Sequence, residues 1–202
     1  GPVFSSRKFK NYSHKKNNKK YNIGAFNTSF SPHGVNGFYA HYLYFTYLKS
    51  LIEKYDLKIF FKGKYDYELF QKNNLTSHIL RELIDISNFN LVERYVSQRS
   101  IINDSDLIIS MTFATPGFEA LYLKKKCFFV DLSSNFKNSL IDNYTDNFVA
   151  HGIEDSKKLF KFYYEKNDEQ VSKTIDKNSK SIFEDSLNHD PINFIKTSIF
   201  NN

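Results

Sequence analysis

The stretch that decides the fold is residues 105–121, which reads SDLIISMTFATPGFEAL. After Ser105 and Asp106 comes an apolar run, residues 107–111, and the stretch continues through small hydroxyl residues to Pro116 and Gly117. A buried parallel strand reads as a continuous apolar run, and proline is favoured in the first turn of a helix. A second apolar run, residues 127–132, follows. The pattern predicts a loop between a strand end and a helix start, where open α/β sheets bind ligands and helix N-termini favour anions.

The rest of the chain alternates strand-like and helix-like segments. We expect further strands over residues 21–27, 57–61, 91–96 and 147–151. We expect helices over residues 38–55, 66–71, 101–104 and 154–166, after Pro116, from Thr76 or Ser77 to about Ile86, and once or twice within 171–200. Strands that alternate with helices indicate βαβ units and a sheet covered on both faces. The sequence therefore predicts an α/β fold, a Rossmann-like three-layer domain with a mostly parallel sheet of about six strands.

Positive charge is concentrated at the amino end of the chain. The net charge is +6, and seven lysines and arginines lie within the first twenty residues. We expect residues 1–20 to be a tag-cleavage scar, Gly1-Pro2, followed by a basic linker, and residues 21–202 to form one domain. The alternative is a basic arm that contacts anionic lipid. Without this segment the chain is near neutral, which argues against a nucleic-acid partner.

The cysteine content and the hydropathy pattern limit the cellular setting. Cys127 is the only cysteine, which excludes an internal disulfide, and it falls within a predicted buried strand. No apolar run approaches the ~20 residues that a membrane-spanning helix needs. We therefore expect a cytoplasmic protein, with peripheral attachment to the inner face of the membrane as a further option.

The segment DLIISMTFATPGFEALYLKKKCFFVD, residues 106–131, resembles the carboxyl-terminal, donor-binding half of GT-B glycosyltransferases. Residues 117–121, GFEAL, are similar to those of bacterial capsule and lipopolysaccharide transferases that use CMP-activated Kdo. Lys62-Gly63-Lys64 resembles the basic motif that such proteins place against the nucleotide phosphate, although it lacks their His-Pro. The resemblance implies one half of a GT-B fold. It also implies a glycosyltransferase that moves a sugar from a nucleotide-activated donor, with a CMP-sugar expected, onto a bacterial surface polysaccharide.

Several residues could bind the phosphate of such a donor. Hydroxyl groups, backbone N–H groups at a helix start and a lysine are what a phosphate in a crevice requires. The resemblance adds Glu119 as a contact of a ribose or sugar hydroxyl. The expected nucleotide-sugar site comprises Asn27, Thr28, His33, Lys62, Lys64, Ser110, Thr112, Thr115, Gly117, Phe118 and Glu119. Each has a structural alternative, such as a surface lysine at a strand end or a threonine helix cap.

The sequence names no catalytic residue. We expect no metal and no cofactor besides the donor, because a lysine and a helix N-terminus could stabilise the leaving phosphate and no Asp-x-Asp pair follows a strand. In GT-B enzymes the acceptor site and commonly the general base lie on the amino-terminal domain. We expect this chain to lack that domain, to meet its glycan acceptor through it, and to be inactive alone.

Two other functions stay open at this point. One is a polyol-phosphate transferase domain that uses a CDP-polyol. The other is a non-catalytic Rossmann-like interaction module whose basic arm binds a membrane.

Overall fold

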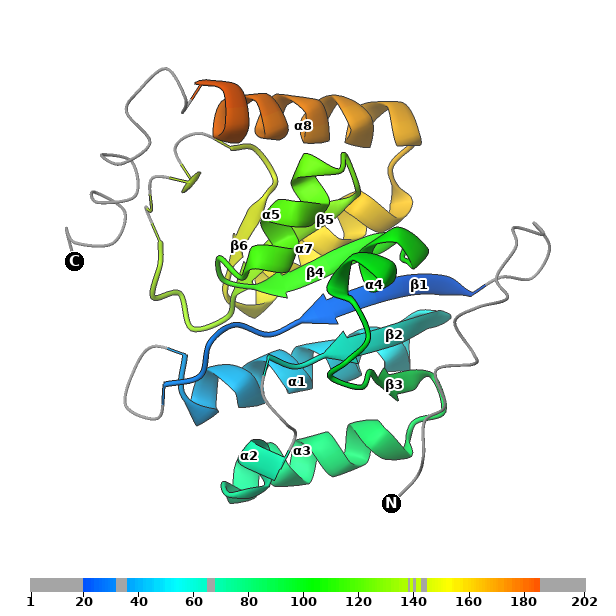
Figure 1. Cartoon of the computed structure of the whole chain (residues 1–202), viewed down its shortest axis with the longest axis vertical. Coiled ribbons are helices and arrows are strands. Elements are labelled where there is room, and N and C mark those ends of the chain that lie inside the picture. The colour runs from blue at the N-terminus through cyan, green and yellow to red at the C-terminus, as the bar shows by residue number, and fades with distance from the viewer. Residues whose placement is uncertain are drawn as a thin grey trace.

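A computed structural model of the chain describes residues 20–31, 36–64, 68–137, 139, 141–142 and 145–185. Within these residues, six strands form one sheet in the order β3-β2-β1-β4-β5-β6, and every neighbouring pair is parallel (Figure 1). The strands are β1 (Tyr21–Phe26), β2 (Leu57–Lys62), β3 (Phe89–Leu91), β4 (Leu107–Met111), β5 (Cys127–Asp131) and β6 (Val149–His151). The predicted α/β, Rossmann-like fold with a parallel sheet is confirmed.

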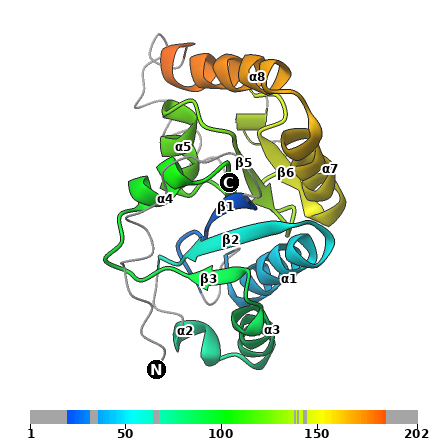
Figure 2. The same ribbon diagram turned by 90° about the vertical axis from the view of Figure 1, so that its right-hand side faces the viewer.

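Helices cover both faces of this sheet. They are α1 (Phe38–Lys54), α2 (Glu68–Gln71), α3 (Asn74–Asp85), α4 (Gln98–Asp104), α5 (Thr115–Tyr122), α7 (Gly152–Glu165) and α8 (Asp168–Lys180), and a π-helical turn η2 (Ser181–Asp185) follows α8. Figure 2 shows α1 and α7 on one face and α4 and α5 on the other. The strand order reverses between β1 and β4, so the carboxyl ends of these two strands form the topological switch point at which open α/β sheets bind ligands.

Helix α1 is tied to both halves of the molecule by two buried tyrosines. The Tyr44 hydroxyl donates to the carbonyl of Ile109 in β4 (2.8 Å), and the Tyr47 hydroxyl donates to the carbonyl of Ser156 in α7 (2.9 Å). Burial raises the pKa of both hydroxyls well above the usual tyrosine value, so they remain donors. The hydrogen bonds satisfy polar groups that would otherwise be buried without partners.

Two glycines allow α4 and α5 to approach the sheet closely. A Cβ on Gly24 of β1 would lie 2.7 Å from the Ile108 side chain and 2.8 Å from the Ser105 hydroxyl. A Cβ on Gly117 of α5 would lie 2.4 Å from the Phe129 ring in β5. Any larger side chain at either position would push a helix or an aromatic ring out of a close-packed core.

The element boundaries differ from the predictions in several places. Strand β3 spans Phe89–Leu91, not residues 91–96, because Phe89 is the buried partner of Ile59. Helix α3 begins at Asn74, not at residue 76 or 77, because the Asn73 side chain caps it by accepting from Leu75 and Thr76 N–H.

Smaller differences occur at the other end of the sheet. Strand β6 is shorter than the predicted 147–151, since Asn147 has a left-handed φ of 50°. Helix α7 begins at Gly152, not at Glu154. The basic residues 1–19 and the segment around Pro191 lie outside the described residues, while Lys20 is ion-paired with Asp56.

The single cysteine is buried in β5, as predicted, and burial raises the pKa of the Cys127 thiol. None of the helices within the described part of the chain is both long enough and apolar enough to cross a lipid bilayer.

Candidate functional site

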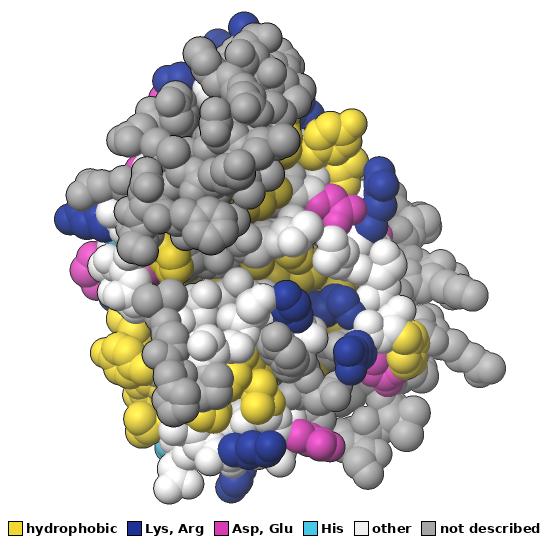
Figure 3. Space-filling view, turned by 60° about the vertical axis from the view of Figure 1, so that its left-hand side comes forward, with side chains coloured by type: hydrophobic (Ala, Val, Ile, Leu, Met, Phe, Trp, Pro, Cys, Tyr) yellow, Lys and Arg dark blue, Asp and Glu magenta, His cyan; other side chains and the backbone are white. Residues whose placement is uncertain are grey.

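A pocket of about 350 Å³ opens at the carboxyl ends of β1, β2 and β4, at the topological switch point. It is lined by Phe26, Asn27, Thr28, Ser29, Lys62, Gly63, Lys64, Arg94, Gln98, Phe113, Ala114, Thr115 and Pro116. Figure 3 shows lysine and arginine side chains gathered around a hollow on this face of the molecule. The place in the fold is the one that the sequence predicted for a ligand.

The lining is strongly cationic. Lys62, Lys64 and Arg94 contribute three positive charges, and none of the described aspartates or glutamates belongs to the lining. The Lys62 ammonium donates to the carbonyls of Glu93 (3.3 Å) and Arg94 (2.7 Å). An ammonium has three N–H donors, so one is left without a partner among the described residues. Burial, and to a smaller degree the Arg94 charge, lowers the pKa of Lys62, which an anion in the pocket would offset.

Asn27 is the most informative polar residue of the pocket. Its side chain follows β1 and is 4% exposed. The Asn27 Oδ1 accepts a hydrogen bond from the Lys64 backbone N–H (2.7 Å), which fixes the orientation of the amide. The Nδ2 group is buried and finds no acceptor within the described part of the chain. A buried donor without a partner costs ~1–3 kcal/mol, so this amide is poised to donate to an oxygen of a ligand.

The start of α5 forms another side of the pocket. Its N-cap residue is Ala114, which has no capping side chain, and Thr115 and Pro116 line the pocket. The preceding residue, Phe113, has a φ of 54°, a left-handed conformation that is costly for a bulky aromatic residue. Such strain is often found where a backbone is held for function.

The structure brings together five of the predicted site residues. Asn27, Thr28, Lys62, Lys64 and Thr115 all line the pocket. The Lys64 ammonium also donates to the Ser29 hydroxyl (2.6 Å), so that the loops after β1 and β2 are joined at the rim. His33 lies outside the described residues.

The other predicted residues of the 110–119 segment do not line this pocket. The Thr112 hydroxyl donates to the Val130 carbonyl (3.1 Å), and the Gly117 N–H donates to the Ala114 carbonyl (3.0 Å). Glu119 does not line the pocket itself but accepts a hydrogen bond from the amide of Gln98, which does.

Two further residues of this segment face the core. The Ser110 hydroxyl is buried in β4 and has no partner among the described residues. The Phe118 ring packs against Phe129, with the ring centres 4.9 Å apart.

Sequence reasoning missed Arg94 and Gln98. Both lie beyond β3, Arg94 in the turn that follows the strand and Gln98 at the start of α4, and the strand was predicted to run through residue 96. With the correct end of β3, the rule that ligand contacts follow parallel strands would have pointed to this segment.

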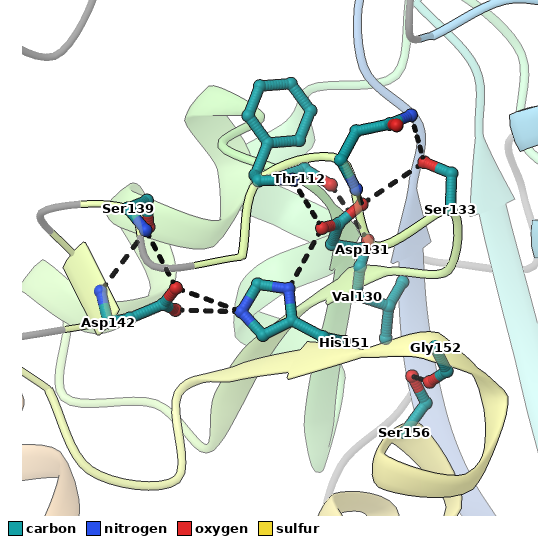
Figure 4. A network of polar contacts seen from close by, with 11 residues as sticks. Thr112, Val130, Asp131, Ser133, Ser139, Asp142, His151, Gly152 and Ser156 are labelled. Atoms are coloured by element: carbon teal, nitrogen blue, oxygen red, sulfur yellow. Dashed lines mark hydrogen bonds and ion pairs between the residues drawn. The ribbon is translucent and has the colours of Figure 1, made fainter.

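A second polar cluster lies at the carboxyl ends of β5 and β6. The His151 ring sits between the carboxylates of Asp131 and Asp142 (Figure 4). In the part of the chain that the structure describes, no group of three histidine, cysteine, aspartate or glutamate side chains is arranged to hold a metal ion.

Several solved structures share this fold at low sequence identity. S. aureus MnaA, solved with UDP, has a TM-score of 0.55 and 16% identity, over 88% of this chain and 46% of that one. The UDP-GlcNAc 2-epimerase of Neisseria meningitidis, bound to UDP-GlcNAc, has a TM-score of 0.52 and 15% identity, over 84% and 45%. The enzyme of the same name from Methanocaldococcus jannaschii, with UDP-GlcNAc and UDP, has 0.52 and 15%, over 73% and 40%.

This chain therefore spans less than half the length of each of these proteins. No curated protein matches its sequence. One family does match, over residues 1–160, and its description is "polysaccharide biosynthesis PFTS motif protein". Because this match covers well over half of the chain, the protein belongs to the polysaccharide biosynthesis PFTS motif family.

Proposed function

We propose that this chain binds the nucleotide-activated sugar donor of a glycosyltransferase in polysaccharide biosynthesis. The observation that carries the proposal is the cationic pocket at the switch point. Its wall contains a buried amide donor, Asn27 Nδ2, that has no acceptor among the described residues. The family description supplies the process, polysaccharide biosynthesis. The proteins of similar fold that were solved with UDP or UDP-GlcNAc support a nucleotide sugar as the ligand class.

In this proposal, the pocket stabilises the phosphate that leaves when the sugar is transferred. Donors placed in advance around a developing negative charge lower the barrier of a reaction. The third N–H of the Lys62 ammonium, the Lys64 and Arg94 charges and the Asn27 amide supply such donors. The Thr115 hydroxyl and the backbone N–H groups at the uncapped start of α5 add further donors.

The nucleoside would extend toward Gln98, whose amide holds the Glu119 carboxylate. A carboxylate accepts hydrogen bonds only, which suits a ribose or sugar hydroxyl. We propose a CMP-sugar as the donor and a glycan as the acceptor, with the acceptor bound by another domain. The chemistry on this chain would then require no metal.

A calorimetric titration with CMP, CDP, UDP, GDP and inorganic pyrophosphate tests the proposal. We expect a cytidine nucleotide to bind, and to bind more weakly as the salt concentration rises, since the contacts are ionic. Tighter binding of CDP than of CMP would favour a CDP-polyol donor. Binding of none of the five would reject the nucleotide role and leave an interaction module, which co-sedimentation with anionic vesicles, with and without residues 3–20, would examine.

Two variants and one control test the pocket itself. Asn27→Asp keeps the Oδ1 acceptor and the shape but replaces the donor with a charged oxygen, and we expect the nucleotide affinity to fall by at least about tenfold. Lys62→Met should weaken binding by a similar factor. Lys58→Met is the matched control, because Lys58 lies on the same strand but outside the pocket lining, with its ammonium over the Phe60 ring. If all three variants bind alike, the site assignment is wrong.

A further inference from the structure

The second polar cluster, Asp131–His151–Asp142, joins three segments of the carboxyl edge. His151 Nδ1 lies 2.9 Å from Asp131 Oδ2, and Nε2 lies 3.0 Å from both oxygens of Asp142 (Figure 4). The imidazole is 13% exposed, Asp131 is 1% exposed and Asp142 is 20% exposed. The cluster is therefore largely removed from water.

This geometry requires a protonated ring. Both ring nitrogens face carboxylates, which only accept hydrogen bonds, so both must carry hydrogen. Burial alone would lower the pKa of His151, but the hydrogen bonds to Asp131 and Asp142 and their charges outweigh it and raise the pKa. The imidazolium stands at the N-cap of α7, where the helix dipole disfavours a cation. The acidic residues of the next turn, Glu154 and Asp155, are bound to Lys157 and Lys158.

Asp131 also stabilises the turn that follows β5. Its two oxygens accept hydrogen bonds from the Ser133 hydroxyl (3.2 Å), the Asn135 N–H (3.2 Å) and the Phe136 N–H (2.8 Å). Together with the imidazolium, these donors make a buried carboxylate tolerable, since an unpaired buried charge is strongly destabilising. The position of the Phe136 backbone therefore depends on the Asp131 side chain.

Phe136 leads from this cluster to the pocket. Its ring packs edge-to-face on Phe113, with the ring centres 5.5 Å apart, and Phe113 also contacts Phe129 at 5.6 Å. Phe113 is the pocket-lining residue with the left-handed backbone. A strained conformation persists only when its surroundings hold it. The two rings are part of those surroundings, together with the hydrogen bond from the Ala114 N–H to the Met111 carbonyl (3.1 Å).

We propose that His151 is a positioning residue for the ligand pocket, acting through Asp131 and Phe136 to hold Phe113 in place. The imidazolium neutralises the buried carboxylate, the carboxylate orders the 132–136 turn, and the turn presses Phe136 against Phe113. The pocket is thereby shaped by a group that does not line it. The identity of the ligand rests on the function proposed above, whereas the coupling to Phe113 does not.

A pH titration by ¹H–¹⁵N NMR tests the coupling without any ligand. We expect the Phe136 and Phe113 amide signals to shift with the midpoint of the His151 ring protons. Asp142→Asn removes the more exposed carboxylate, so all three midpoints should move together to lower pH, by about one unit. His151→Gln should abolish the pH-dependent shift of the Phe113 signal, and His78→Gln, on an exposed face of α3, should leave it intact. If the Phe113 amide signal does not shift at the pH at which His151 titrates, the proposal is wrong.

The affinity for pyrophosphate or CDP provides the second readout. We expect His151→Gln to weaken binding about threefold to tenfold, with thermal unfolding showing that the variant remains folded. An unchanged affinity in a variant whose Phe113 signal has moved would also overturn the proposal. If the unaltered protein binds neither ligand, the proposed function fails, and the NMR titration alone decides whether His151 positions Phe113.

Discussion

The carboxyl edge of the sheet has two halves that differ in how their polar groups are satisfied. Around the ends of β1, β2 and β4, three cations surround a pocket and the Asn27 amide has no acceptor among the described residues. Around the ends of β5 and β6, Asp131, His151 and Asp142 complete one another. The first half contains the topological switch point between β1 and β4, whereas the second half lies at one end of the strand order. The proposed ligand site lies in the half where the pocket wall holds a donor without an acceptor among the described residues, and the closed network lies in the half that we propose supports it.

Asp131→Asn should give the largest effect and should act on stability. Asparagine would present an N–H₂ group to a site filled with donors and would leave the His151 charge with one partner fewer. We expect the free energy of unfolding to fall by about 3–5 kcal/mol, the range seen when one member of a buried ion pair is removed. Denaturant unfolding measures it. If Asn27→Asp lowered the free energy of unfolding by as much as Asp131→Asn, the distinction between the two halves would be wrong.

The buried His41 and the partly buried His151 should give opposite dependences of stability on pH. His41 in α1 lies among the rings of Phe30, Phe45 and Phe70, and burial lowers its pKa to about 4. Its contribution is complete above the unfolded value of ~6.5 and is lost as the pH falls toward 4, by about 3 kcal/mol. The pKa of His151 is raised, so its contribution is complete below ~6.5 and is lost as the pH rises through its folded pKa.

Denaturant unfolding between pH 4 and 9 would show both slopes. His41→Met should remove the acid-side loss only, and His151→Gln should remove the loss on the alkaline side only. An acid-side slope that survives His41→Met would assign that titration to another group.

Gly117→Ala should produce an intermediate loss of stability and little change in affinity. The added methyl group would overlap the Phe129 ring, and overpacking of a core costs about 1–3 kcal/mol. Denaturant unfolding together with a nucleotide titration separates the two effects. A normal stability with lost binding would show that this glycine serves the pocket and not the packing of α5.

Lys124→Ala should give the smallest effect. The Lys124–Asp176 ion pair, 3.2 Å long, is solvent-exposed, and such pairs contribute less than about 1 kcal/mol. We expect unfolding and nucleotide binding to stay within error of the unaltered chain. If its affinity fell as much as that of Lys62→Met, overall charge and not the pocket would explain binding.

The sequence predicted strands correctly where each strand is a continuous run of buried residues. Residues 107–111 and 127–131 are buried and apolar except for Ser110 and Asp131, and these two strands were predicted within one residue. Strand β3 was misplaced because its burial rests on one residue, Phe89, and its pairing with Ile59 of β2 is not encoded nearby. The N-cap of α3 was also missed, because Asn73 and Thr76 are both good capping residues. In the structure Asn73 caps the helix, and the Thr76 hydroxyl donates to the Phe70 carbonyl.

The site could be predicted only where it follows directly from strand ends. Asn27, Lys62 and Lys64 lie at or just after β1 and β2, and this placement is what the sequence rule uses. The His151 cluster could not be found that way, because its partners lie 20 and 9 residues away along the chain. The left-handed Phe113 is equally beyond sequence reasoning, since nothing in a phenylalanine predicts a positive φ.

The tyrosine hydroxyls of α1 bear on how this protein could respond to a ligand. The Tyr44 hydroxyl ties α1 to β4, the strand that precedes the α5 side of the pocket, and the Tyr47 hydroxyl ties α1 to α7. Helix α1 cannot move relative to β4 or α7 unless a buried hydroxyl loses its acceptor. We therefore expect conformational change on ligand binding to be confined to the loops and side chains at the pocket rim, while α1, β4 and α7 keep their relative positions.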